Sequence, residues 1–136
     1  MTRLELSVRV DAPAETTWAA VTDWARQGEW MLLTRVRVVG GDGRSAGSSL
    51  SAFTGVGGVG FTDTMRITAW EPPHRCAVEH TGRLVRGTAE FRVVERGAGS
   101  EFVWSEDVPW ALALAFAPGV RWSLHRFASF AREYRR

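Results

Sequence analysis

Residues 120–136 read VRWSLHRFASFAREYRR, and this stretch decides how the chain folds. Its apolar side chains recur at spacings of four, three, four and three residues, which is the period of one face of an α-helix. They are Val120, Leu124, Phe127, Ala131 and Tyr134. Polar and basic side chains occupy most of the other positions. The pattern predicts an amphipathic C-terminal helix of about five turns whose apolar face packs against the rest of the chain.

The chain begins with a strand and two short helices. Apolar and polar residues alternate over residues 3–10, as in a strand that has one buried face. Asp11, Pro13 and Glu15 follow as a helix-start signal, because a capping residue, a first-turn proline and an early acidic residue all favour a helix N-terminus. The expected helices span residues 13–23 and 24–30.

Six more strands separated by short connections are expected before the C-terminal helix. Glycine, proline and aspartate mark the turns between them, which is typical of hairpins rather than of crossover helices. The expected strands span residues 34–39, 47–54, 61–70, 75–81, 85–95 and 101–108. The sequence therefore predicts an α+β fold with a seven-stranded antiparallel sheet. No linker, repeat or low-complexity tract interrupts residues 1–136, so one domain is expected.

Composition excludes several classes of protein. The 136 residues are 45% hydrophobic and 24% charged, as in an ordinary folded domain. All 17 basic residues are arginines, and they are scattered rather than gathered on one segment, which argues against nucleic-acid binding. The single Cys76 excludes an intrachain disulfide and a cysteine-based zinc site, and we expect it to be an inert buried thiol.

The N-terminal ten residues lack the apolar core of a signal peptide. The longest apolar run, residues 108–120, contains two prolines and is too short to span a bilayer. We therefore expect a cytoplasmic protein without stable membrane insertion, as a monomer or homodimer. No His and carboxylate pair has the spacing of a metal site, so neither a metal nor another cofactor is expected.

Several short segments together resemble one known superfamily. They are residues 8–18, the pairs Asp23–Trp24 and Glu29–Trp30, residues 67–75 (ITAWEPPHR) and residues 102–105 (FVWS). On these residues nearly the whole chain resembles the START-like (SRPBCC) superfamily, in particular its polyketide cyclase/dehydrase and lipid-transport branch. The resemblance implies the helix-grip fold, in which a curved seven-stranded sheet wraps around the long C-terminal helix and encloses a cavity.

The resemblance implies a cavity but not a reaction, because one fold carries many functions in this superfamily. Relatives bind lipids, quinones, polyketides or hormones, and some cyclise or dehydrate a bound polyketide. The favoured prediction is binding, with or without transport, of a hydrophobic small molecule such as a lipid, polyketide or aromatic metabolite. The alternative is a polyketide cyclase or dehydratase. A third hypothesis is a protein-interaction or regulatory module.

Three polar residues fall in register with apolar positions of the expected strands. Asp63 is in register with Phe61 and Met65, His80 with Cys76, and Glu106 with Trp104. A carboxylate that faces an apolar cavity is suited to acid/base chemistry. The other interpretation is that each lies at a wet strand end, paired with an arginine. The candidate cavity residues are Trp30, Phe53, Phe61, Asp63, Met65, His80, Trp104, Glu106 and Phe127. For the aromatic residues among them, packing in the core is the alternative.

Two further segments invite an interpretation. Residues 55–60 read GVGGVG and match a dinucleotide-binding pattern, but they precede a strand rather than a helix. We expect a flexible hairpin loop there, and an apolar lid over the cavity is the hypothesis for its function. Residues 108–117 are ten residues without a charge, more apolar than a surface loop should expose, and we expect them to cap the cavity, to lie in a dimer interface or to touch a membrane surface.

Overall fold

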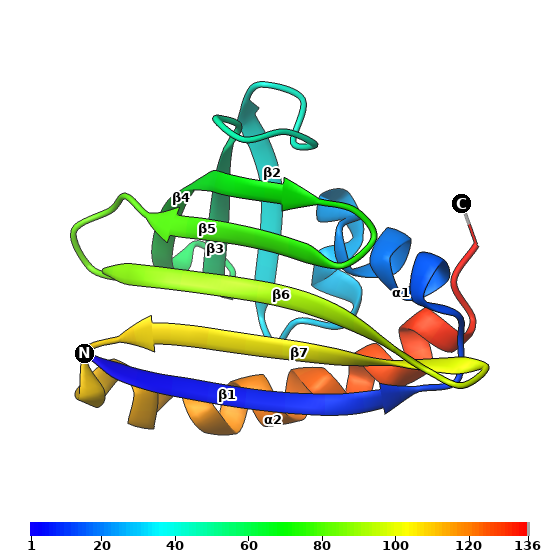
Figure 1. The fold of residues 1–136 in the computed structure, drawn as a ribbon. Helices are drawn as coiled ribbons and strands as arrows, with labels where there is room; N and C mark the ends of the chain where they lie inside the picture. The colour runs from blue at the N-terminus through cyan, green and yellow to red at the C-terminus, as the bar shows by residue number, and fades with distance from the viewer. Residues whose placement is uncertain (136) are drawn as a thin grey trace.

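A computed structural model describes residues 1–135 and shows a curved antiparallel sheet packed against a long C-terminal helix (Figure 1). The elements are β1 (Thr2–Val10), α1 (Ala14–Val21), the 3-10 helix η1 (Trp24–Glu29), β2 (Thr34–Gly40), β3 (Ser49–Val56), β4 (Val59–Glu71), β5 (Arg75–His80), β6 (Gly87–Arg96), β7 (Gly99–Val108) and α2 (Trp110–Arg132). The seven strands, the two short helices after β1 and the terminal helix confirm the predicted helix-grip fold.

The sheet has the order β1-β7-β6-β5-β4-β3-β2, and every neighbouring pair is antiparallel. Strands β2 to β7 follow one another as hairpins, and β1 pairs with the last strand, β7. Helix α2 runs along β1 and β7, while α1 and η1 lie toward its C-terminal end (Figure 1). The concave side of the sheet is thus covered by helices.

An aromatic cluster joins α2 to the sheet. The Phe127 ring centroid lies 4.8 Å from that of Trp30 and 4.7 Å from that of Phe102. All three side chains are fully buried. The apolar face predicted for the terminal helix is buried as expected, from Val120 through Tyr134. Burial of these large rings provides most of the attraction between the two layers.

Helix α2 begins ten residues before the predicted start, and this corrects the sequence interpretation. Pro109 precedes its first turn, and the Pro109 carbonyl accepts hydrogen bonds from the N–H groups of Leu112 and Ala113 at 2.9 and 3.1 Å. Pro118 lies inside the helix rather than before it. A proline removes only one helical hydrogen bond, and here the remaining bonds hold the helix together. Residues 108–117 therefore form the end of β7 and the first turns of α2, not a surface loop.

The glycine-rich segment forms the predicted hairpin, and its turn is short. Strand β3 runs to Val56 and β4 starts at Val59, which leaves only two residues in the turn. Gly55 and Gly60 pair across the hairpin, and a Cβ on either would overlap a backbone carbonyl of the partner strand. These glycines allow the two backbones to approach closely. No helix within residues 1–135 is both long and apolar enough to cross a membrane.

Candidate functional site

A cavity of about 390 Å³ lies between the concave face of the sheet, the η1–β2 connection and the N-terminal half of α2. Apolar side chains from the sheet and from α2 form most of its wall, among them Leu50, Phe91 and Phe116. Ala115 also lines the cavity and is exposed, so the cavity reaches solvent beside α2. The volume falls in the range of sites that enclose a small organic molecule.

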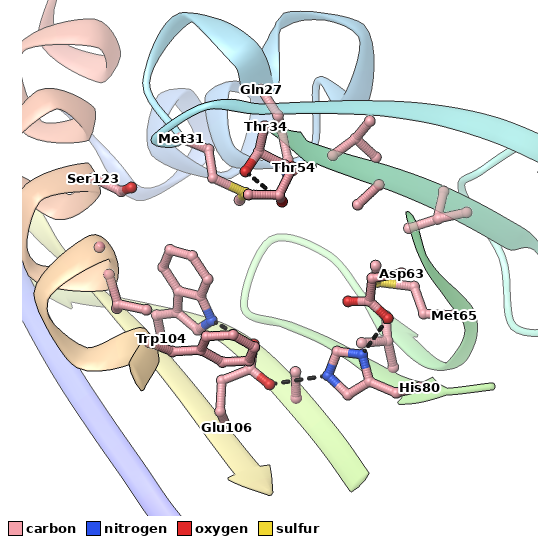
Figure 2. A pocket seen from close by; sticks show the side chains of 18 of the residues that line it. Gln27, Met31, Thr34, Thr54, Asp63, Met65, His80, Trp104, Glu106 and Ser123 are labelled. Carbon is pink, nitrogen blue, oxygen red and sulfur yellow. Dashed lines mark hydrogen bonds and ion pairs between the residues drawn. The ribbon is translucent and has the colours of Figure 1, made fainter. Parts of the chain in front are cut away.

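Three polar side chains converge at one end of the cavity (Figure 2). His80 Nδ1 lies 3.0 Å from Asp63 Oδ1, and His80 Nε2 lies 3.0 Å from Glu106 Oε2. Trp104 Nε1 donates to the other Glu106 oxygen, Oε1, at 3.1 Å. The His80 side chain is only 4% exposed and those of Asp63 and Glu106 are 14% and 10% exposed. We call this group the Asp63–His80–Glu106 triad.

The sheet brings the triad together from three different strands. Asp63 lies on β4, His80 on β5 and Glu106 on β7, so the imidazole must reach across β6 to Glu106. At this level β6 has only Gly87, opposite His80, and Ala89, opposite Glu106. Their small size leaves the space through which His80 and Glu106 meet.

The two carboxylates hold His80 as an imidazolium. Burial lowers the pKa of His80, but the hydrogen bonds and charges of Asp63 and Glu106 outweigh it and raise the pKa to about 10. At neutral pH both ring nitrogens are therefore protonated, and each donates a hydrogen bond to a carboxylate. The ring has no free nitrogen to offer a metal ion or a substrate proton. Within residues 1–135 no group of His, Cys, Asp and Glu side chains is arranged to hold a metal.

The opposite wall of the cavity carries neutral polar groups (Figure 2). The hydroxyl of Thr34 donates to the Leu32 carbonyl at 2.7 Å and lies 3.0 Å from the hydroxyl of Thr54. Ser123 Oγ accepts the Leu32 N–H at 2.9 Å, which ties the η1–β2 connection to α2. These groups mainly fix the cavity wall, because most of their hydrogen bonds go to the backbone of that connection.

The structure separates the predicted cavity residues into two groups. Those that line the cavity are Phe61, Asp63, Met65, His80, Trp104 and Glu106. Trp30 and Phe127 instead belong to the buried aromatic core, and their placement in the cavity was wrong. Phe53 does not line the cavity either. Because its neighbours Ala52 and Thr54 face inward, Phe53 faces the outer side of the sheet. There the Arg35 guanidinium lies 5.5 Å from the centroid of the Phe53 ring.

Several lining residues had not been singled out from the sequence. Thr54 could have been found from the period of two that it shares with Ala52, whereas Met31 and Phe116 lie in segments without a strand pattern. Cys76 also lines the cavity. Burial raises the pKa of the Cys76 thiol to about 12, which outweighs the lowering effect of Arg75 and keeps the thiol protonated and unreactive.

Solved structures with the same fold cover nearly the whole chain. The Zhui aromatase/cyclase from Streptomyces sp. R1128 is 17% identical over 96% of this chain and 93% of its own, with a TM-score of 0.81. A protein from Mesorhizobium loti is 11% identical over 99% and 100%, with a TM-score of 0.81. Ara h 8.0201 is 10% identical over 98% and 99%, with a TM-score of 0.72. At these identities the likeness shows the fold alone.

No curated protein matches the sequence. Residues 1–132 match the sequence model of a protein family that is described as polyketide cyclase / dehydrase and lipid transport. This match confirms the superfamily indicated by residues 67–75 and the other resembling segments. It covers every strand and helix of the fold, including the triad and α2. The chain therefore belongs to the polyketide cyclase/dehydrase and lipid-transport family.

Proposed function

We propose that this protein binds a hydrophobic small molecule of the lipid, polyketide or aromatic-metabolite class in the cavity. The observation that carries the proposal is an apolar cavity of about 390 Å³ whose charged groups are concentrated at one end. Apolar burial supplies the affinity of such a site, and a few polar groups fix the orientation of the ligand. We also propose that the protein acts in the cytoplasm, where a free thiol such as that of Cys76 stays reduced.

Filling the cavity is expected to abolish binding. Ala52 faces the cavity from the middle of β3, so Ala52→Phe places a ring in the ligand volume. Native mass spectrometry of the purified protein should detect a co-purifying small molecule in the wild type and lose it, by at least about tenfold in occupancy, in Ala52→Phe. Ser51→Phe is the matched control, because it adds the same ring to the same strand on its outer face. Equal occupancy in Ala52→Phe and Ser51→Phe would exclude this cavity as the binding site.

A second candidate function is dehydration or cyclisation of a bound ketone, and the triad favours it. Asp63 Oδ2 has no hydrogen-bond partner among the described residues, so it is placed to accept a proton from carbon next to a carbonyl. As that C–H bond breaks, the C=C bond forms and the C–O bond to the leaving hydroxide breaks. The hydroxide leaves as water by taking the proton that Asp63 Oδ2 has just accepted, which restores the carboxylate. The His80 imidazolium keeps both ring protons and its hydrogen bonds to Asp63 Oδ1 and Glu106 Oε2.

The catalytic candidate is tested with the aldol adduct of benzaldehyde and acetone, a β-hydroxy ketone that loses water to a conjugated enone. If the triad catalyses this step, Asp63→Asn should slow enone formation by about 100-fold, because the amide cannot accept the proton. Glu71→Gln, which removes an exposed carboxylate on the same strand, should leave the rate unchanged. A wild-type rate equal to the uncatalysed rate removes this candidate and leaves ligand binding standing.

A further inference from the structure

The charge at the polar end of the cavity restricts the kind of molecule that fits, an inference that rests on the proposed binding function. Both ring nitrogens of His80 donate hydrogen bonds, so the ring carries one positive charge. Asp63 and Glu106 each carry one negative charge as the acceptors of those bonds. The triad therefore has a net charge of −1 inside a mostly apolar cavity.

Nothing in the cavity wall balances this charge. The chain has 17 basic residues, all of them arginine, yet no arginine lines the cavity. Glu90 lies between Ala89 and Phe91, which face the cavity, so its carboxylate is directed to the outer face, where it pairs with Arg75 at 2.6 Å and Arg92 at 2.9 Å. A ligand anion at the triad would thus meet a net negative charge, and the His80 imidazolium cannot bind it because both of its N–H groups are already bonded to carboxylates.

The triad also has only one carboxylate oxygen left to accept a hydrogen bond. Glu106 uses one oxygen for Trp104 and the other for His80. Asp63 uses Oδ1 for His80, and Oδ2 has no partner among residues 1–135. Figure 2 shows this second oxygen directed toward the interior of the cavity. A ligand satisfies it by donating a hydrogen bond, not by accepting one.

We propose that the cavity selects neutral molecules that carry a hydroxyl group, and that it rejects carboxylates. The hydroxyl donates to Asp63 Oδ2, and the apolar part of the molecule lies among the apolar side chains. A carboxylate of the same shape loses its hydration, cannot donate, and is repelled by the triad. A site built around one polar group discriminates strongly against an analogue that lacks the matching partner. Fatty acids and aromatic acids are therefore excluded as ligands, and alcohols and phenols are accepted.

Three probes of one shape test this selectivity by isothermal titration calorimetry at neutral pH. β-Naphthol donates a hydrogen bond, β-methoxynaphthalene cannot donate, and β-naphthoate is an anion. The wild type should bind β-naphthol about tenfold more tightly than β-methoxynaphthalene and at least about 100-fold more tightly than β-naphthoate. Asp63→Asn neutralises the triad and should tighten β-naphthoate binding by at least about tenfold.

Glu79→Gln is the matched control. Glu79 precedes His80 on β5 but is exposed on the outer face, 3.6 Å from Arg66, and its replacement makes the same change in net charge. The preference for β-naphthol should stay unchanged in Glu79→Gln. Equal affinity of the wild type for all three probes overturns the selectivity and leaves ligand binding intact. The absence of binding by both neutral probes overturns the proposed function together with the selectivity.

Discussion

Replacing Phe127 with alanine is expected to lower the free energy of unfolding by about 3–5 kcal/mol. The Phe127 ring is fully buried, and its centroid lies within 5 Å of those of Trp30 and Phe102. Its removal leaves a void at the place where α2 meets the sheet, and the surrounding rings are too tightly packed to fill it. Urea denaturation followed by tryptophan fluorescence measures the loss.

Phe53→Ala is the control for this prediction. Phe53 is a phenylalanine of the sheet too, but it is half-buried on the outer face, where the Arg35 guanidinium lies 5.5 Å from its ring. Its replacement should cost no more than about 1 kcal/mol. Equal losses in the two variants would mean that Phe127 does not have the central packing position described above.

Stability is expected to fall as the pH rises above neutral, because folding raises the pKa of His80. The folded pKa of about 10 exceeds the ordinary value of 6.5, so the folded protein holds a proton that the unfolded chain releases. The stabilisation is fully present below about pH 6.5 and is lost as the pH rises through about 10. The total is roughly 5 kcal/mol, of which about 2 kcal/mol is lost between pH 6.5 and 8.5.

Between pH 6.5 and 8.5 the Cys76 thiol adds only a little to this decline, because its ordinary pKa in the unfolded chain is 9.0. Urea denaturation at several pH values should show the decline in the wild type and a flatter profile in His80→Gln. His125→Gln, on the exposed face of α2, should keep the wild-type profile. A wild-type profile as flat as that of His80→Gln would mean that the imidazolium is not held by the two carboxylates.

The terminal helix shows how far a hydrophobic period can predict structure. Its second half was predicted correctly, because charged residues between the apolar ones make the period visible from Val120 onward. The first half was not, because residues 110–117 have no charged residue to set a period and Pro118–Gly119 is typical of a helix boundary. Only the packing of these turns over the cavity shows that the helix continues through the proline.

The site was predictable in its parts and not in its assembly. The register of Asp63, His80 and Glu106 with apolar neighbours indicated that each faces inward. Their convergence depends on which strands pair and on the small side chains of Gly87 and Ala89 between them, and the period along a single strand contains no such information. For the same reason the pattern could not separate core aromatics such as Trp30 from the rings that line the cavity.

Methyl NMR of methionine gives the most direct test that a ligand enters the cavity beside the triad. The chain has three methionines, of which Met31 and Met65 line the cavity while Met1 is 78% exposed at the N-terminus. During a titration with β-naphthol, the methyl signals of Met31 and Met65 should shift together and reach saturation, and that of Met1 should stay in place. Saturable binding that leaves Met31 and Met65 unchanged would contradict a ligand site in this cavity.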